Sequence, residues 1–306
     1  MISYTIRRLA QVVLVMWAVS LLVFAMLLIA PGDPASTLAG EDATQEDIEA
    51  IEVKFGLDKP VHIRYGIWLG RVLQGDLGRS IVTRRPVSEE IISRLPLTAE
   101  LAAAALIIAI AGGMFVGIIS AVYQYSIVDH AAMIISLLGV STPSFWLGLM
   151  LIFFFSVRLR WFPIGGGGSL AALVLPAFSL GVSSAANIAR MTRSSLLEVI
   201  RQDYVRTARA KGLNERTVLM RHTLKNAMIP IVTVIGLRFG YLLGGAVITE
   251  TVFARPGLGR LLVDGIRARD FPAVQGTIML LSASFVIINL LVDLTYAQLD
   301  PRIHYE

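Results

Sequence analysis

The sequence predicts an all-α polytopic membrane protein with six transmembrane helices and a small extracytoplasmic helical cap. Of its 306 residues, 55% are hydrophobic and 16% are charged, and the mean hydropathy is +0.70. Apolar runs of membrane-spanning length recur along the chain, which is typical of a helical membrane protein. The basic side chains gather in one polar stretch between two of these runs, as in a loop on the cytoplasmic side of a membrane.

Six apolar runs can cross a bilayer at a rise of about 1.5 Å per helical residue. They are residues 9–30, 97–122, 131–157, 170–189, 228–249 and 276–296. The first run is longer than the apolar core of a signal peptide, and Pro31 and Gly32 follow it without a small-residue cleavage site. We therefore expect an uncleaved first span, and six spans place both termini on the same side of the membrane.

Composition divides the chain into four segments. They are an N-terminal tail with the first span (1–30), a polar extracytoplasmic cap (31–96), a five-helix core (97–296) that contains a basic loop (190–227), and a C-terminal tail (297–306). Within the cap, Thr44 and Pro60 each precede a segment with amphipathic helical spacing. This cap is either a folded loop that shields the spans or a contact surface for an extracytoplasmic partner, and the sequence slightly favours the first.

Prolines and glycines mark particular positions within the spans. Pro143, Pro176 and Pro230 interrupt the helical hydrogen-bond ladder, which membrane helices tolerate. Glycines that recur every fourth residue in two spans let neighbouring helices approach closely. They are Gly113 and Gly117 in one span, and Gly236, Gly240 and Gly244 in another. We expect ordinary helix packing at each of these stripes.

The distribution of Lys and Arg orients the spans. Residues 190–225 contain nine basic residues against three acidic ones, so we expect this loop in the cytoplasm, together with Arg7, Arg8 and Arg302. Two features fit this orientation poorly. The loop 123–130 has no Lys or Arg, and four arginines follow the fifth span on the external side. These are Arg255, Arg260, Arg267 and Arg269. The predicted orientation, with both termini cytoplasmic, therefore depends mainly on the large basic loop.

The polar stretch 203–230 interrupts the apolar core and predicts two short helices joined by a hinge. Ala208 and Ala210 favour the first helix. Gly212 can adopt the left-handed conformation that ends this helix, and Asn214 can cap the next one. A hinged basic pair of helices between two spans is either a plain cytoplasmic loop or a docking surface for a soluble partner. The hinge and its spacing favour docking.

Nothing in the sequence predicts bond chemistry or a bound cofactor on this chain. The four glycines at 165–168 lack the Gly-Lys-Ser/Thr of a phosphate-binding loop, cysteine is absent, and the four histidines suggest no metal-ligand spacing. The net charge of +5 reflects the basic loop, which is tethered to the membrane at both ends, so we expect no nucleic acid partner. Any energy source must therefore be an ion gradient or another subunit.

Three motifs stand out in and around the basic loop. They are Arg190-Met-Thr-Arg193-Ser-Ser195, the stretch from Asp203 to Leu213, and His222-Thr-Leu-Lys-Asn226-Ala-Met-Ile-Pro230. Supporting stretches are Pro31-Gly32-Asp33-Pro34, Gly56-Leu-Asp-Lys-Pro60, Gly75-Asp76-Leu77-Gly78, Pro256-Gly257-Leu-Gly259 and Asp300-Pro301-Arg302-Ile-His-Tyr305. Together they resemble, nearly end to end, the inner-membrane permease subunits of the dipeptide/oligopeptide/nickel class of ABC importers. The resemblance is closest to the dipeptide and glutathione branch.

This resemblance implies a permease with the type I ABC importer fold in a bacterial inner membrane, surrounded by lipid. Such a subunit forms half of a pathway for di- or oligopeptides or related solutes, including glutathione, opines and nickel complexes. Its implied partners are a second homologous permease, two cytoplasmic ABC ATPase subunits that bind ATP and magnesium, and an extracytoplasmic substrate-binding protein. The alternatives are an ion-gradient-driven secondary transporter, which would usually show internal repeats and midplane carboxylates, and a membrane-embedded enzyme, which would need a catalytic pairing.

The resemblance also implies that the basic loop seats a short coupling helix in a cleft of an ATPase subunit. The implied coupling residues are Asp203, Tyr204, Arg206, Thr207, Ala208, Arg209, Ala210, Lys211, Gly212, Leu213, His222, Leu224 and Asn226. Ala208 and Ala210 would allow a close approach, and the basic side chains of this helix would supply charge. The general Glu-Ala-Ala pattern of such loops matches only Ala208, Gly212 and Leu224, so the salt bridge of its glutamate is not expected here.

Arg238 lies ten residues into its span, so it is roughly 15 Å deep and close to the bilayer midplane. An unpaired charge there costs at least about 2.5–3.5 kcal/mol, so Arg238 must face a cavity or a partner. Asn187, Asn289 and Asp293 are the polar residues at comparable depths. Arg238 is either held by a carboxylate or by carbonyl groups, or it lines the translocation path and steers a substrate carboxylate. The sequence supports both interpretations equally.

Overall fold

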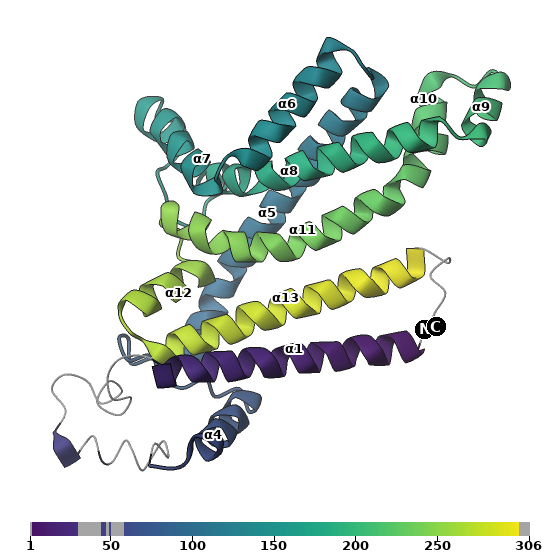
Figure 1. The fold of residues 1–306 in the computed structure, drawn as a ribbon. Coiled ribbons are helices and arrows are strands. Elements are labelled where there is room, and N and C mark those ends of the chain that lie inside the picture. Colours follow the sequence, from purple (N-terminus) through teal and green to yellow (C-terminus); the bar gives the residue numbers. More distant parts are fainter. Residues whose placement is uncertain (1, 30–43, 47–48, 50–57, 300–306) are drawn as a thin grey trace.

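The computed structural model describes residues 2–29, 44–46, 49 and 58–299, and the regular elements of that part are helices (Figure 1). The five longest are α1 (Ile2–Ile29), α5 (Val87–Val122), α8 (Leu170–Ile200), α11 (Leu224–Val252) and α13 (Phe271–Leu299). Each contains a segment long and apolar enough to cross a membrane. A sixth span is broken into α6 (Ile127–Ser141), α7 (Ser144–Leu151) and the π-helical η1 (Ile152–Arg158). The prediction of an all-α chain is therefore confirmed, with five unbroken apolar spans, or six when the bent α6–α7 pair is counted as one.

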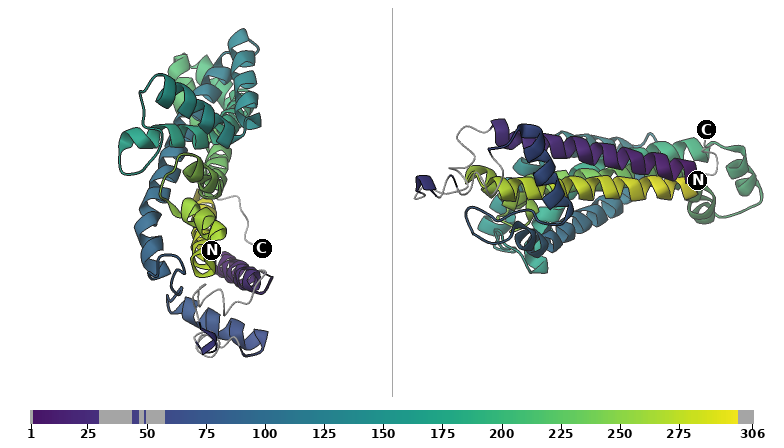
Figure 2. Two further views of the ribbon diagram at one scale, coloured as in Figure 1. Left: turned by 90° about the vertical axis from the view of Figure 1, so that its left-hand side faces the viewer. Right: turned by 90° about the horizontal axis from the view of Figure 1, so that it is seen from below.

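The long helices give the molecule two ends (Figures 1 and 2). One end, the α9 end, carries α9 (Asp203–Ala210) and α10 (Glu215–Thr217) together with the start of α1 and the last turns of α13. The opposite end, the α12 end, carries α4 (Val61–Leu73) and α12 (Leu258–Arg267). The first and last long helices thus have their outer ends on the same side, as an even number of crossings requires.

Helices α5 and α8 pack closely because two residues of α5 at their contact are glycines. A Cβ atom on Gly113 would lie 2.6 Å from the carbonyl oxygen of Ala185, and one on Gly117 would lie 2.6 Å from that of Ala189. Any larger residue would push the two backbones apart. The predicted close approach at this stripe is confirmed, and it joins α5 and α8 into one unit.

The glycine stripe of α11 is used only in part. Gly236 and Gly240 face α13, where added Cβ atoms would overlap Val292 and lie 2.8 Å from Phe285. Gly244 has no atom of another element within 4 Å of its Cβ position. The stripe therefore packs α11 against α13 at two of its three positions.

The third span is not one continuous helix, contrary to our expectation for residues 131–157. The chain leaves α6 after Ser141 and enters α7 at a bend of 101°. Thr142 is extended, with ψ at 122°, because the ring of a following proline disfavours the helical conformation. Pro143 also lacks the amide hydrogen that would continue the ladder. By contrast, Pro176 lies within α8 and Pro230 within α11.

Two helices extend beyond the apolar runs that predicted them. α5 begins at Val87 rather than at residue 97, so ten residues of the predicted cap belong to this helix. Glu89 and Glu90 lie in its first turn, where carboxylates stabilise the positive end of the helix dipole. α8 continues to Ile200 instead of ending at residue 189, because no Gly or Pro interrupts that stretch.

The described part of the cap is anchored to α1. Pro60 directly precedes α4, as the sequence predicts, and Tyr65 and Trp68 of this helix pack on Phe24 with ring centroids 5.5 and 5.7 Å apart. The hydroxyl groups of Tyr65 and Ser20 are also 2.7 Å apart and share a hydrogen bond. The helix expected over residues 45–55 and the tail 300–306 lie largely or wholly outside the described residues.

Candidate functional site

The candidate coupling segment is the connection between α8 and α11. It contains α9, the short α10 and a π-helical stretch, η2 (Val218–Thr223), which leads into α11. Gly212 has a φ of 77°, and its amide donates to the carbonyl oxygen of Arg209 at 2.9 Å. The side chain of Asn214 accepts a hydrogen bond from the amide of Thr217 at 2.8 Å and so caps α10. Both local features of the predicted hinge are confirmed.

One face of α9 packs on its own chain and the other is exposed. Val205, Ala208 and Val218 form a buried cluster against Val199 near the end of α8. The remaining coupling candidates on and after α9 are exposed, namely Asp203, Tyr204, Arg206, Thr207, Arg209, Ala210, Lys211, Gly212, Leu213 and Asn226. His222 and Leu224 are half-buried. Ala208 is only 6% exposed, so our expectation that it allows a partner to approach closely is wrong.

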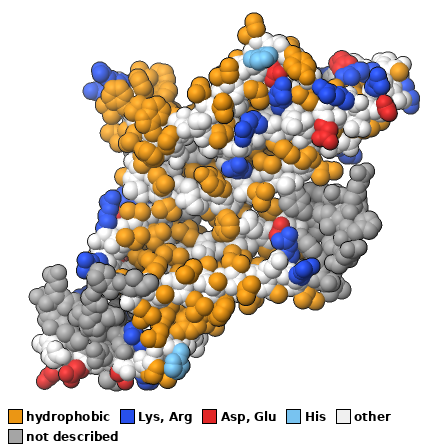
Figure 3. All heavy atoms as spheres, in the orientation of Figure 1, with side chains coloured by type: hydrophobic (Ala, Val, Ile, Leu, Met, Phe, Trp, Pro, Cys, Tyr) orange, Lys and Arg blue, Asp and Glu red, His pale blue; other side chains and the backbone are white. Residues whose placement is uncertain are grey.

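Side-chain contacts fix the shape of this segment. Arg209 Nε donates to Glu215 at 2.8 Å, which ties α9 to α10 across the hinge. Asn226 Nδ2 donates to the hydroxyl of Tyr204 at 3.0 Å, which ties α9 to α11. Part of the charge expected to face a partner is therefore balanced within the chain. Figure 3 shows Lys and Arg side chains over α9 and α10, beside the apolar surface of the long helices.

Arg238 lies on a half-buried part of α11, with its guanidinium carbon 5.6 Å from the ring centre of Tyr241. It is two residues from both Gly236 and Gly240, which face α13, so Arg238 lies on the opposite side of α11. Asn289 of α13 contacts the side of α11 that carries Gly240, since its Oδ1 is 3.3 Å from the Cβ position of this glycine. The structure therefore separates Arg238 from Asn289.

The two other path candidates have partners of their own. Asp293 accepts from Arg8 at 2.9 Å, which links α13 to α1. Asn187 donates to the carbonyl oxygen of Ser183 at 2.8 Å and accepts from Arg190 at 3.0 Å.

The helix register places Asn187 at the level of Arg238. A Cβ atom on Gly245 of α11 would lie 2.9 Å from Leu180 of α8. Arg238 and Asn187 are each seven residues from this contact on two antiparallel helices. Asn289 lies at this level too, but on the other side of α11, because Gly240 faces it.

The sequence-based prediction missed a buried polar network at the α12 end. Glu250 and Arg255 are both completely buried. Glu250 accepts from Thr98 at 2.6 Å and from the amide of Gly259 at 2.7 Å. Arg255 donates to Glu100 at 2.5 Å. Glu250 and Arg255, in the corner between α11 and α12, thus both bind the part of α5 where the second apolar run begins.

This network explains why an arginine follows the fifth span on the side where the sequence disfavours it. Arg255 also donates to the carbonyl oxygen of Leu97 at 3.3 Å, so it serves to fold the corner. A buried, paired arginine of this kind need not report which side of the membrane its loop occupies. In the sequence, Glu250 could have indicated this network, because it is a carboxylate at the end of an apolar run, six residues before Pro256.

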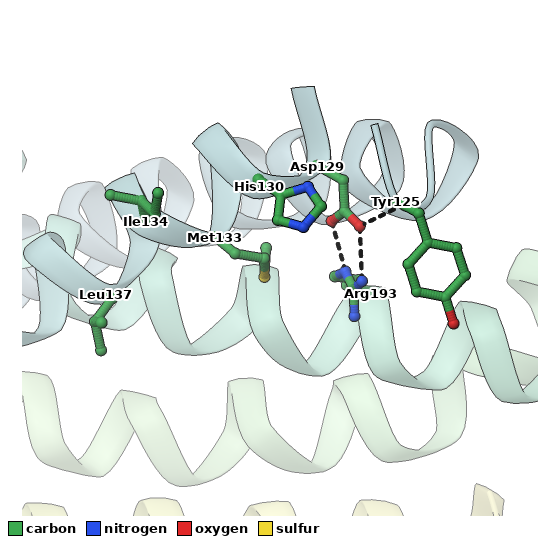
Figure 4. Close-up of a pocket in the computed structure, with 7 residues that line it drawn as sticks. All are labelled: Tyr125, Asp129, His130, Met133, Ile134, Leu137 and Arg193. Atoms are coloured by element: carbon green, nitrogen blue, oxygen red, sulfur yellow. Dashed lines mark hydrogen bonds and ion pairs between the residues drawn. The ribbon is translucent and has the colours of Figure 1, made fainter. Parts of the chain in front are cut away.

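A second network that the prediction missed lies nearer the α9 end (Figure 4). Arg193 of α8 binds Asp129 of α6 through two hydrogen bonds of 2.7 Å. Asp129 is 2% exposed and also accepts from the hydroxyl of Ser120 and, at 2.9 Å, from the amide of Tyr125. An open cavity of about 350 Å³ lies beside the pair and is otherwise lined mainly by apolar side chains of α6. In the sequence, Asp129 could have indicated this network, because it is the single acidic residue of the loop 123–130, which has no Lys or Arg.

Among the described residues, no three His, Asp or Glu side chains are grouped as a metal site would require. The polar constellations present here join helices to one another, through ion pairs and hydrogen bonds. They can hold and orient helices, and the exposed face of α9 can contact another protein.

Two family descriptions match the chain. Residues 113–305 match the binding-protein-dependent transport system inner membrane component, and residues 1–102 match the N-terminal region of such membrane components. The glutathione transport system permease protein GsiC of Escherichia coli O6:H1 is 45% identical over 306 residues, which cover all of both chains. The protein of the same name from Salmonella choleraesuis is 44% identical over the same length.

Two solved structures are similar in fold. A chain of an amino acid ABC transporter crystallised with histidines superposes with a TM-score of 0.55 at 17% identity, over 69% of this chain and 95% of that one. A chain of the MetNI methionine ABC transporter, in an inward facing conformation, superposes with a TM-score of 0.50 at 24% identity, over 66% of this chain and 92% of that one. At these identities the likeness shows the fold alone.

Proposed function

We infer the function from the premise that this chain belongs to the family of binding-protein-dependent transport system inner membrane components. It is a permease subunit of an ABC importer, with the type I importer fold, in the peptide and glutathione branch. It is a multi-pass inner membrane protein of a family of transport permeases rather than enzymes. The family decides against the gradient-driven transporter that the sequence left open.

We propose that the solute is a small peptide of the size of glutathione. Identity of 45% over the whole length to a glutathione transport permease supports this class. The chain would form half of the pathway beside a second homologous permease. An extracytoplasmic binding protein would deliver the solute, and two cytoplasmic ATPase subunits, which hold ATP and magnesium, would supply the energy.

We further propose that α9 is the coupling helix and that the α9 end is cytoplasmic. The observation that carries this proposal is the two-sided packing of α9. Val205 and Ala208 bury one face against the chain itself, while polar and charged side chains occupy the exposed face. A short helix anchored in this way presents a firm polar surface to a soluble partner. The basic residues of the same segment favour the cytoplasmic side.

Co-purification tests this proposal. The tagged chain is isolated in mild detergent from membranes that contain all subunits, as wild type and as the variant Arg206→Glu. The Arg206 side chain is 77% exposed, with one loose ion pair of 3.6 Å, so its reversal leaves the fold intact. We expect the ATPase subunits to accompany the wild type and to be reduced at least about tenfold with the variant, because like charges meet at the contact.

Arg267→Glu is the matched control, since Arg267 is an exposed arginine at the α12 end. We expect this control to retain the ATPase subunits at the wild-type level. If the Arg206→Glu variant also retains the ATPase subunits, α9 is not part of the surface that contacts them. A wild-type chain that purifies without any ATPase subunit would contradict the coupling proposal altogether.

A further inference from the structure

Few of the side chains in α6 are buried against the rest of the chain. Of its 15 residues, Asp129 and Ser136 are buried, whereas Ile134, Leu137 and Leu138 are 59%, 55% and 60% exposed. In a bilayer, apolar side chains that face lipid or another subunit supply little force toward α8, because lipid tails are equally apolar. The position of α6 on this chain therefore depends on a small number of specific contacts.

The two-pronged ion pair with Arg193 is the strongest of these contacts. The Nε and Nη2 atoms of Arg193 each lie 2.7 Å from a different carboxylate oxygen of Asp129. This geometry fixes the relative orientation of the two side chains as well as their distance. The same carboxylate also accepts from the hydroxyl of Ser120 in α5. It accepts as well from the amide of Tyr125, in the turn before α6 (Figure 4). The pair thus joins three helices at one point.

Arg193 is also close in sequence to α9. It lies seven residues before the end of α8 at Ile200, and only two residues separate that end from α9. Val199, in the last turn of α8, packs on the buried face of α9. A displacement of α9 would therefore be passed to the end of α8 that carries Arg193.

The other end of α6 continues into α7, which reaches the α12 end of the molecule. Gly148 of α7 faces Phe253, with its Cβ position 3.0 Å from that ring. Phe253 directly follows α11 and is 2% exposed. The segment 127–158 thus spans from the ion pair near the α9 end to the corner between α11 and α12.

We propose that the Asp129–Arg193 pair is a positioning device that makes α6 and α7 follow the coupling segment during the transport cycle. This inference rests on the proposed role of α9. Arg193 holds α6 to α8, and α8 carries the motion of α9. Without the two-pronged pair, α8 would still move with α9, but α6 would be left with apolar packing on α8, such as that of Gly139 on Val182 and Ala186, and would follow it less closely. ATP-driven closure of the ATPase subunits would then fail to rearrange this part of the pathway.

A distance measurement on the assembled importer tests the inference without requiring its solute. The chain contains no cysteine, so Leu137→Cys on α6 and Ile287→Cys on α13 can carry two spin labels, with cysteine-free partner subunits. Both positions are exposed, at 55% and 52%. The label separation is measured by electron spin resonance without nucleotide and with ATP plus orthovanadate. With wild-type Asp129 and Arg193 we expect a shift of at least about 2 Å between the two states, within the range of helix shifts in such transitions.

Two variants remove the two-pronged pair in different ways. Arg193→Lys keeps the charge but not the planar fork, and the double variant Asp129→Asn with Arg193→Gln leaves no unpaired charge in the interior. We expect both to lose most of the shift while retaining the ATPase subunits. Arg190→Gln is the matched control, because Arg190 is an exposed arginine one turn earlier on α8 whose side chain donates a hydrogen bond to Asn187.

The outcomes separate the two proposals. A full shift in both variants would overturn the positioning role, as would a wild-type complex in which the labels do not move although the ATPase subunits are bound. Loss of the shift in Arg190→Gln as well would show a general loss of order in α8 and would also overturn it. A complex without ATPase subunits would instead overturn the proposed coupling function and this inference with it.

Discussion

At the α12 end, Glu250 and Arg255 are completely buried and bonded to α5, whereas at the α9 end the charged side chains of α9 are exposed. The first group finds its partners within the chain, since Thr98, Leu97 and Glu100 all belong to α5. The second group has local partners of the kind that contribute little, such as the exposed pair between Arg209 and Glu215.

The contrast shows which end is complete in the isolated chain. Buried charges need partners, and Glu250 and Arg255 bind defined groups of α5 and of the corner. Nη1 of Arg255 is the one atom of this pair left without a hydrogen bond among the described residues. The α9 segment has a small apolar contact and a hinge at Gly212, and its exposed face is available to another protein. In the proposed coupling, the α12 end would act as a fixed joint and the α9 end as the surface that the ATPase subunit moves.

The largest expected effect is at the fixed joint. Gly257→Ala would place a methyl group against the carboxylate of Glu250, because the Cβ position overlaps its oxygens. We expect a loss of about 3 kcal/mol or more in the free energy of unfolding, from overpacking together with disturbed hydrogen bonds. Thermal unfolding in detergent, followed by size-exclusion chromatography, measures it.

Gly244→Ala provides the matched control, since nothing lies within 4 Å of its Cβ position. In a helix this exchange is neutral or stabilising by up to about 1 kcal/mol. Equal stability of the two variants would show that the α12 corner is less rigid than the contrast requires.

The same substitution at the movable end should have a smaller effect. Gly212→Ala forces an alanine into a φ of 77°, but no atom lies within 4 Å of the new Cβ. We expect a cost of about 1–2 kcal/mol from backbone strain alone. Unfolding measured beside Gly257→Ala checks the order of the two effects, and a larger loss at Gly212 would reverse the comparison.

Between the two ends, Arg238→Gln removes the charge near the middle of α11. The loss of its contact with Tyr241 should cost about 1 kcal/mol or less. We expect uptake of acidic peptides to fall more than uptake of neutral ones, which is measured in vesicles with a charge series of peptides. Tyr241→Leu is the control that removes the ring and leaves the charge. If Arg238→Gln changes all peptides equally or none of them, Arg238 does not steer substrate charge.

The smallest expected effect is the loss of an exposed ion pair. Glu215→Ala frees Arg209 from its contact across the hinge, and the two side chains are 72% and 40% exposed. Such pairs contribute about 0.2–1 kcal/mol, so we expect little change in the unfolding temperature. Raising the salt concentration should reduce even that difference. A loss comparable to that of Gly257→Ala would mean that the α9 segment is as firmly built as the α12 corner.

Features that depend on neighbouring residues were predictable. The apolar runs indicated the spans because a helix must satisfy its own backbone in lipid, and five of the six runs lie in single helices. Gly212 and Asn214 indicated the hinge because both act through their own backbone or that of the next few residues. Pro143 was recognised as an interruption, but its 101° bend was not, since Pro176 and Pro230 remain inside helices.

The sequence by itself determined the all-α membrane class, the spans and the hinge of the basic loop, because local hydropathy and backbone preference control them. Only the tertiary structure decided which charges meet. Arg193 finds Asp129 across 64 residues, and Glu250 finds Thr98 across 152, while Arg238 and Asn289 are kept apart by the rotation of α11. Such pairings depend on which faces of distant helices come together, and no local property of the chain specifies that.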